Sequence, residues 1–203
     1  MKIICVGRNY TEHIKELDNE RPSEPVIFIK PDTAVLGKGQ DFHIPYFSDD
    51  IHYETEILIK INKVGKHIAP RFAPNYYDEI SLGIDFTARD MQRKLKEKGL
   101  PWEKAKGFDG AALIGTWLPK TTFKDINAIN FSLSRNGKRV QQGNTALMLW
   151  KTDALVAHIS TYFTLKKGDI IFTGTPAGVG KIASGDYLEG YIEEEQCFAV
   201  RIK

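Results

Sequence analysis

Short apolar runs separated by turn residues recur along the chain, and this pattern predicts a protein built mainly from β-strands. The longest expected strand, 52–62, begins with polar residues at every second position and continues into an apolar run. Phe42 to Pro45 is expected at a sheet edge, because proline cannot donate a hydrogen bond to a neighbouring strand. An Asn136-Gly137 pair predicts a hairpin. The expected strands are 2–6, 26–30, 42–45, 52–62, 112–115, 130–135, 138–142, 169–173 and 199–202.

Three segments have the composition and boundaries of helices. Residues 87–98 contain good helix formers and are followed by Gly99-Leu100-Pro101, a sequence that ends helices. Residues 152–162 have an amphipathic pattern, and 11–17 are expected to form one or two helical turns. Tyr77 to Asp85 is compatible with either a helix end or a strand.

The composition is that of an ordinary soluble globular protein. Of the 203 residues, 42% are hydrophobic and 27% are charged, and no repeat or linker divides the chain. We therefore expect one α+β domain, rich in β-strands, over residues 1–203. The net charge of +2 is too small and too evenly spread to indicate a nucleic-acid or membrane partner. The basic residues at 94–98 are interleaved with other types and are expected on a solvated helix face.

The cysteines and the lengths of the apolar runs indicate in which cellular compartment the protein is expected. Cys5 and Cys197 are the only cysteines, and they lie near opposite ends without the CxxC spacing of a zinc site. The apolar run at 1–7 is too short for a signal peptide, and no stretch approaches the ~20 apolar residues that cross a bilayer. We expect a reduced, soluble, cytoplasmic protein.

His52, Glu54 and Glu56 occupy alternate positions of the longest expected strand, so their side chains would share one face. Two carboxylates about 7 Å apart along a strand repel each other unless a positive group lies between them. A bound cation would meet this need, but charged residues also alternate on solvent-facing strands, and the spacing alone leaves both interpretations open. His52-Tyr53-Glu54 matches half of a zinc deaminase signature; the missing PCxxC partner excludes that class.

Asp85 lies in a mostly apolar context just before an expected helix, where a carboxylate either caps the helix or binds a ligand. Together with Glu54 and Glu56 it would complete a site of three carboxylates. Ligation by oxygen alone favours Mg²⁺, Mn²⁺ or Ca²⁺. Arg89 and Lys106 would supply balancing positive charge.

Two further patterns are ambiguous when taken alone. His13 and Glu16 are three positions apart on a short helix, which suits either an acid/base dyad or an incidental exposed pair. The glycine-rich segment 173–181 is not a phosphate loop, because the GxxxxGK spacing would need glycine at Thr175. It suits close approach of the backbone to a ligand, or a tight connection between strands.

Taken together, these motifs resemble the fumarylacetoacetate hydrolase family, and in particular its compact acylpyruvase-like members. The resemblance covers almost the whole chain and rests on the number and order of the motifs. They are Gly7-Arg8-Asn9-Tyr10 with His13 and Glu16, Phe28-Ile29-Lys30-Pro31, His52-Tyr53-Glu54-Thr55-Glu56, Asp85-Phe86-Thr87-Ala88-Arg89-Asp90 with Gln92, Lys98-Gly99-Leu100-Pro101-Trp102, Ala105-Lys106-Gly107-Phe108-Asp109, Gln142-Gly143-Asn144-Thr145, and 173–180.

The resemblance implies a mixed β-roll fold, a homodimer and a role for each matching residue. The metal, Mg²⁺ or Mn²⁺ with Ca²⁺ as a further candidate, would be held by Glu54, Glu56 and Asp85. The family pattern differs at 190–197, where a glycine-rich turn common in the family is missing, so the last hairpin is left open. The implied catalytic residues are His13, Glu16 and Lys106, and the implied substrate-binding residues are Lys30, Arg89, Gln92 and Thr175.

The implied activity is metal-dependent hydrolysis of a C–C bond in a 2,4-dioxo acid (an acylpyruvate), which yields pyruvate and a carboxylic acid. Decarboxylation of oxaloacetate is expected as a second reaction, because it needs the same enolate but no water. The alternatives are an isomerase or decarboxylase of the 2-hydroxyhepta-2,4-diene-1,7-dioate type, an oxaloacetate tautomerase, and a non-catalytic protein that binds 2-oxo acids.

Overall fold

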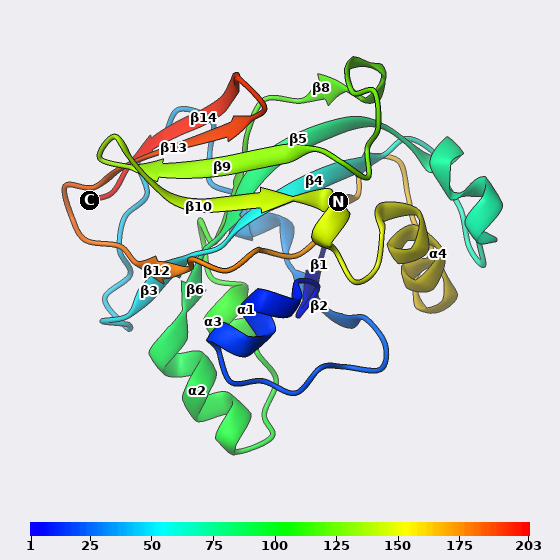
Figure 1. Cartoon of the computed structure of the whole chain (residues 1–203). Helices are drawn as coiled ribbons and strands as arrows, with labels where there is room; N and C mark the ends of the chain where they lie inside the picture. Colours follow the sequence, from blue (N-terminus) through cyan, green and yellow to red (C-terminus); the bar gives the residue numbers. More distant parts are fainter.

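Two stacked β-sheets form the body of the protein in the computed structural model, which describes all 203 residues (Figure 1). The larger sheet has the order β2-β1-β11-β4-β5-β7, and β8 also pairs with β5. All of its pairings are antiparallel except the one between β1 and β11. Its strands are β1 (Ile3–Gly7), β2 (Val26–Lys30), β4 (Thr55–Ile61), β5 (Tyr77–Asp85), β7 (Ala112–Ile114), β8 (Leu118–Pro119) and β11 (Ile170–Phe172).

A four-stranded sheet with the order β10-β9-β13-β14 covers the larger sheet, and a three-stranded sheet with the order β12-β3-β6 lies beside them. The β-rich fold expected from the sequence is confirmed. The strands of these two sheets are β3 (Ile51–Tyr53), β6 (Thr87–Ala88), β9 (Asn130–Arg135), β10 (Lys138–Asn144), β12 (Gly180–Lys181), β13 (Tyr187–Ile192) and β14 (Glu195–Arg201).

The core explains why β4 and β5 are so apolar. Leu82 and Leu188 are fully buried between the two stacked sheets. On the opposite face of the larger sheet, Leu58 and Phe172 are also fully buried, in a second cluster. Because both faces of these central strands are covered, their apolar residues need not alternate with polar ones.

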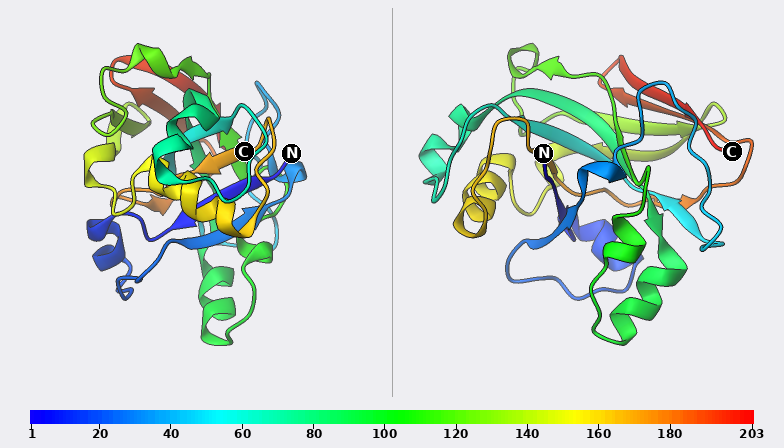
Figure 2. Two further views of the ribbon diagram at one scale, coloured as in Figure 1. Left: turned by 90° about the vertical axis from the view of Figure 1, so that its right-hand side faces the viewer. Right: turned by 180° about the vertical axis from the view of Figure 1, so that it is seen from behind.

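The helices lie at two ends of the molecule (Figures 1 and 2). Figure 1 places α1, α2 and α3 together at one end and α4 apart from them. No helix is long and apolar enough to cross a membrane. The helices are α1 (Thr11–Glu16), α2 (Arg89–Glu97), α3 (Glu103–Lys106) and α4 (Thr152–Tyr162), with short 3-10 helices η1 (Asp32–Ala34), η2 (Pro70–Tyr76), η3 (Lys120–Thr122) and η4 (Thr145–Leu147).

The structure corrects the expectation of one long strand at 52–62. The chain forms β3, leaves the three-stranded sheet at Glu54, and enters the larger sheet as β4. The carbonyl of Glu54 still accepts a hydrogen bond from Asp85 N at 2.8 Å. The apolar and polar pattern is continuous across this point, but the hydrogen-bonding partners change. The sequence therefore could not indicate the break.

Three other expectations are settled by the pairing of strands. Residues 77–85 form a strand, β5, and the two residues at 87–88 join β6, so that α2 begins only at Arg89. Phe42 makes a single parallel bridge to Ile202 in place of the expected edge strand. The last hairpin, β13–β14, does form, with Glu193 at its turn in a left-handed conformation (φ 49°).

Candidate active site

The antiparallel pairing of β4 with β5 brings three carboxylates to one place. Thr55 lies opposite Ile84 in this register, so that Glu54, Glu56 and Asp85 converge at the end of the two strands. One ligand oxygen from each lies within 4.8 Å of the others. The three residues are 5%, 2% and 0% exposed. The expected cluster of three carboxylates is therefore present and buried.

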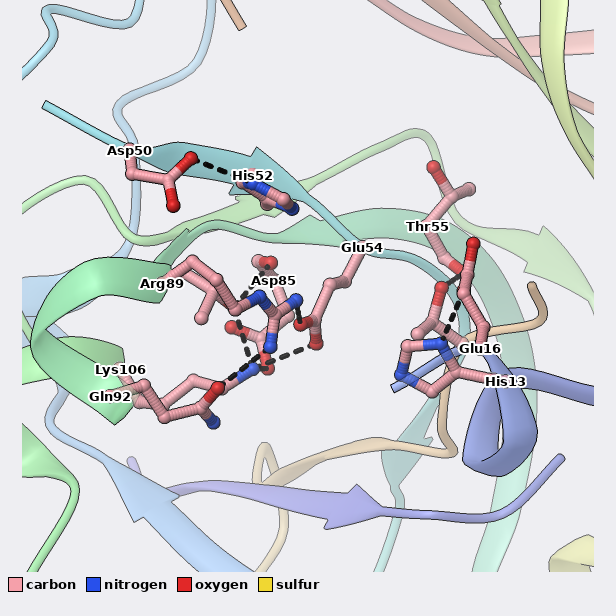
Figure 3. A network of polar contacts seen from close by, with 12 residues as sticks. His13, Glu16, Asp50, His52, Glu54, Thr55, Asp85, Arg89, Gln92 and Lys106 are labelled. Carbon is pink, nitrogen blue, oxygen red and sulfur yellow. Dashed lines mark hydrogen bonds and ion pairs between the residues drawn. The ribbon is translucent and has the colours of Figure 1, made fainter. Parts of the chain in front are cut away.

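Three basic side chains surround this cluster, and Figure 3 shows Arg89 and Lys106 reaching Glu54 from the same side. Lys106 Nζ donates to Glu54 Oε2 at 2.7 Å and to Asp85 Oδ2 at 2.9 Å. Lys30 Nζ lies 2.7 Å from Asp85 Oδ1, and Arg89 Nη2 donates to Glu54 Oε1. Burial opposes ionisation of Glu54, but attraction to Lys106 and Arg89 outweighs it and holds the pKa of Glu54 well below its usual value.

Glu56 differs from the other two carboxylates because no basic side chain is hydrogen-bonded to it. Its Oε2 accepts a hydrogen bond from the backbone N–H of Gly174 at 2.6 Å. Burial, followed by repulsion from Asp85 and Glu54, raises the pKa of Glu56 well above its usual value. The basic side chains thus compensate two of the carboxylates and leave the third short of positive charge.

The cluster fits a hard divalent cation. All the candidate ligand atoms are carboxylate oxygens, which Mg²⁺, Mn²⁺ and Ca²⁺ prefer. Asp85 Oδ1 is buried and has no hydrogen-bond partner, since the 2.7 Å contact with Lys30 lacks hydrogen-bond geometry. Each ionised carboxylate has about four lone-pair positions, so Glu54 can keep Arg89 and Lys106 and still bind a metal.

His13 and Glu16 form a hydrogen-bonded pair beside the carboxylates, as Figure 3 shows. His13 Nδ1 lies 3.0 Å from Glu16 Oε2, and His13 is only 6% exposed. Glu16 Oε1 accepts a hydrogen bond from the backbone N–H of Gly178 at 2.9 Å. Partial burial opposes ionisation of Glu16, but these two partners outweigh it and lower the pKa of the carboxyl group. The His13 ring is therefore held in place from the glycine-rich segment through Glu16.

A cavity of about 50 Å³ joins the carboxylates to the dyad. This volume is enough for a few water-sized groups. Residues from β1, α1, α2, α3 and the glycine-rich segment contribute to its wall. The lining residues named from the sequence are His13, Glu54, Glu56, Asp85, Arg89, Gln92, Lys106 and Thr175.

The expected substrate-binding residues differ in their positions. Gln92 lines the cavity and accepts a hydrogen bond from Arg89 at 2.7 Å. Thr175 also lines it, and its hydroxyl donates to the carbonyl of Thr55 at 2.9 Å. Lys30 is fully buried behind Asp85 and is not part of the cavity wall. Contact between Lys30 and a substrate therefore stays a prediction, whereas the structure does show Lys30 in contact with Asp85.

Several site residues were not identified from the sequence. Gln141 is 2% exposed and joins Thr55 N to the Thr175 hydroxyl, with contacts of 3.1 and 3.0 Å. The motif Gln142-Gly143-Asn144-Thr145 indicated that this part of the chain matters, but it starts one residue after Gln141. Among the other lining residues, Arg8, Phe28 and Trp102 lie within motifs of the resemblance but were given no role there. Leu17, Asn19 and Lys96 were not identified as site residues.

Known proteins resemble this chain in both sequence and structure. Residues 2–202 match the family described as fumarylacetoacetate (FAA) hydrolase C-terminal. The chain is 42% identical over 189 residues to a mitochondrial oxaloacetate decarboxylase from Dictyostelium discoideum, which covers 93% of this chain and 87% of that protein. It is 42% identical over 188 residues to oxaloacetate tautomerase YcgM from Escherichia coli (strain K12), which covers 92% and 86%.

A solved structure is similarly close. Fumarylpyruvate hydrolase from Pseudomonas aeruginosa, in complex with Mn²⁺ and pyruvate, superposes with a TM-score of 0.93 at 33% identity. The match covers 100% of this chain and 89% of that one. The mixed β fold implied by the motifs is therefore confirmed.

Proposed function

Because the chain belongs to the fumarylacetoacetate hydrolase family, we propose that it is a divalent-metal-dependent enzyme that converts a 2-oxo acid through its enolate, with oxaloacetate as the first candidate substrate. The observation that carries the proposal is the arrangement around one cavity. Three buried carboxylates line it together with His13, and Glu16 is paired with His13. Such a site combines a candidate metal site, the carboxylate cluster, with a separate candidate base, His13.

The proposed chemistry divides between the metal and the side chains. A divalent cation at Glu54, Glu56 and Asp85 would supply Lewis-acid polarisation of the 2-oxo group. Lys106 places an ammonium beside the same carboxylates, where it stabilises negative charge on a substrate oxygen. These contributions make carbon 3 of the substrate acidic enough to lose a proton.

His13 would accept that proton. Its Nδ1 faces the Glu16 carboxylate, so a neutral ring carries its proton on Nδ1 and leaves Nε2 free as a base. Removal of a proton from carbon 3 and delivery of a proton to the 2-oxygen convert the keto form of oxaloacetate to the enol. In decarboxylation the C3–C4 bond breaks instead, CO₂ leaves, and the remaining enolate takes up a proton to give pyruvate.

The relatives support oxaloacetate as the substrate. Two of them, at 42% identity, are named oxaloacetate decarboxylase and oxaloacetate tautomerase. Both names describe reactions that need the enolate step alone.

The dyad supports hydrolysis of an acylpyruvate as a second candidate function. His13 and Glu16 are paired at 3.0 Å, in the arrangement of a base oriented by a carboxylate. Acting on water, His13 would take one proton while the oxygen attacks the distal carbonyl carbon. The bond between this carbon and carbon 3 then breaks, and its electron pair passes to the enolate of pyruvate. Carbon 3 takes up the proton held by His13, and the products are a carboxylic acid and pyruvate. A relative of similar structure is named fumarylpyruvate hydrolase.

A parallel assay separates the two candidates. Wild-type protein is incubated with oxaloacetate and with acetylpyruvate, each with Mg²⁺, with Mn²⁺ and with EDTA, and ultraviolet absorbance and pyruvate are followed. We expect metal-dependent conversion of oxaloacetate, and pyruvate plus acetate from acetylpyruvate if water is admitted. Metal-dependent binding of oxalate without turnover of either compound would contradict the proposal and favour a 2-oxo-acid-binding protein.

We also propose that residues 1–203 act as a single domain and that the protein is a homodimer, as the resemblance implies. Light scattering coupled to size-exclusion chromatography tests the second statement. A mass of twice 23.0 kDa is the expected result.

A further inference from the structure

Two basic residues line the cavity without an acidic partner. Arg8, between β1 and α1, forms no ion pair or side-chain hydrogen bond, and Lys96, on α2, forms no ion pair. The other three cations of the site, by contrast, are all committed to the carboxylate cluster through Glu54 or Asp85. The cavity therefore has more positive charge at Arg8 and Lys96 than the protein itself balances.

Lys96 is held toward this region of the cavity. Its Nζ donates to Asn19 Oδ1 at 2.8 Å, and both residues are part of the wall. Partial burial, followed by repulsion from Arg8 and Arg89, lowers the pKa of Lys96. The repulsion indicates that the three cations are near one another, and an anion between them would relieve it.

Arg8 has a backbone conformation that residues with a side chain rarely adopt. Its φ is +58°, in the left-handed region. Such conformations occur in tight turns, as at Glu193, and they also cluster at functional sites. The conformation is thus a second observation, independent of charge, that distinguishes Arg8 from an ordinary surface arginine.

We propose that Arg8 and Lys96 bind the second carboxylate of a dicarboxylic 2-oxo acid. This inference rests on the proposed function, in which the first carboxylate and the 2-oxo group lie at Glu54, Glu56 and Asp85. It predicts that 2-oxo acids with a carboxylate at the far end bind more tightly than those without one. Oxaloacetate and fumarylpyruvate have this feature, and acetylpyruvate lacks it.

Binding of matched ligands tests the subsite without any turnover. Isothermal titration in Mg²⁺ compares 2-oxoglutarate with 2-oxopentanoate, which has the same chain length but no second carboxylate. The variant is Lys96→Gln, on an exposed part of α2 where folding should be preserved. The control is Lys98→Gln, which removes the same charge at the end of the same helix but outside the cavity.

Lys96→Gln should weaken binding of 2-oxoglutarate about tenfold, the effect of losing one charge-assisted hydrogen bond, and leave 2-oxopentanoate within about twofold. Arg8→Gln should act in the same direction, and Lys98→Gln should change neither ligand. The inference would be overturned if Lys96→Gln affected both ligands equally or had no effect on 2-oxoglutarate. It would also be overturned if the wild-type protein bound 2-oxoglutarate no more tightly than 2-oxopentanoate. Failure of the proposed function would appear separately, as absence of turnover of oxaloacetate and acetylpyruvate by the wild-type protein.

Discussion

The backbone N–H of Gly178 donates a hydrogen bond to Glu16 Oε1 at 2.9 Å, although 162 positions separate the two residues. The other oxygen of the same carboxylate holds His13 at 3.0 Å. One side chain therefore connects the glycine-rich segment to the base of the dyad. The position of His13 depends on the backbone of a loop far away in the sequence.

Gly178→Ala should impair the dyad. Gly178 has φ +99°, and a Cβ atom there would lie 2.6 Å from the carbonyl oxygen of Val140, so the loop must shift. We expect loss or weakening of the bond to Glu16 and at least a tenfold fall in the turnover of acetylpyruvate, since misplacement of a catalytic group by about 1 Å can cost 10²-fold. Steady-state kinetics measure the change.

Gly185→Ala is the matched control for this substitution. Gly185 has φ +93°, but a Cβ atom there meets nothing within 4 Å. The two variants share the backbone strain of a positive φ, about 1–3 kcal/mol. If both lose activity and thermal stability to the same extent, the effect of Gly178 is general strain, and the link to Glu16 is contradicted.

Replacement of His13 should separate oxaloacetate decarboxylation from the reactions that use His13 as a base. His13→Ala removes the base that would activate water, and loss of such a group typically costs 10²–10⁴-fold. We expect this loss in acetylpyruvate hydrolysis, whereas oxaloacetate decarboxylation, which needs no attack by water, should keep a larger share of its rate. Both rates are measured on the same protein preparation in saturating Mg²⁺. Unchanged hydrolysis of acetylpyruvate would remove His13 from the mechanism.

The lowered pKa of Glu16 predicts a pH dependence of stability. In the unfolded chain its carboxyl titrates near the ordinary value of about 4.3. Because the folded state favours the ionised form, the contribution of Glu16 is complete above that pH and is lost as the pH falls through the lower, folded pKa. In urea unfolding, the difference between wild type and Glu16→Gln should be largest at pH 6 and should shrink as the pH is lowered below about 4.3. A difference that grows on acidification would show the opposite sign.

The residues that meet in the candidate site could be predicted from the sequence more readily than the residues that hold them in position. Glu54 and Glu56 lie in one compact motif and Asp85 in another, and the antiparallel pairing of β4 with β5 brings the two motifs together. The alternation that placed His52 with them failed to identify its partner, which is Asp50 at 2.9 Å. Alternation describes the faces of one strand, whereas the chain changes sheets at Glu54 and its partners come from other strands.

Lys96 shows the same limit on a helix. The segment 94–98 is expected on a solvated helix face, and Lys94, Lys96 and Lys98 are indeed exposed. Lys96 also lies four positions after Gln92, on the face of α2 that includes two other cavity-lining residues. This spacing could have indicated that Lys96 faces the cavity. The contact of Lys96 with Asn19 could not be predicted from the sequence, because it depends on where α2 meets the segment after α1.

Removal of one proposed metal ligand should abolish metal binding without loss of the fold. Asp85→Asn and Glu54→Gln keep the size of the side chain but replace a charged oxygen ligand, so the affinity for Mg²⁺ or Mn²⁺ should fall beyond detection in isothermal titration. Metal-dependent turnover of every 2-oxo acid should disappear with it. Asp50→Asn, which changes a carboxylate outside the cluster, is the control. Full activity of Asp85→Asn with Mg²⁺ would contradict the assignment.

The buried contact between Lys30 and Asp85 predicts a large effect on stability. Both side chains are fully buried, and Lys30 Nζ lies 2.7 Å from Asp85 Oδ1. Lys30→Met keeps the length of the side chain but removes one of the two cations that contact Asp85, leaving that carboxylate undercompensated. We expect the free energy of unfolding in EDTA to fall by about 3–5 kcal/mol, the usual result of breaking a buried pair.

Lys60→Met is the control for this change, because Lys60 pairs with Glu79 on the same sheet but is partly exposed. Its loss should cost no more than about 1 kcal/mol. Addition of Mg²⁺ should restore part of the stability of Lys30→Met, since a cation bound at Asp85 replaces the missing positive charge, and should restore none in Lys60→Met. Urea unfolding with and without Mg²⁺ measures both effects. Equal losses in the two variants would show that Lys30 does not compensate the charge of the carboxylate cluster.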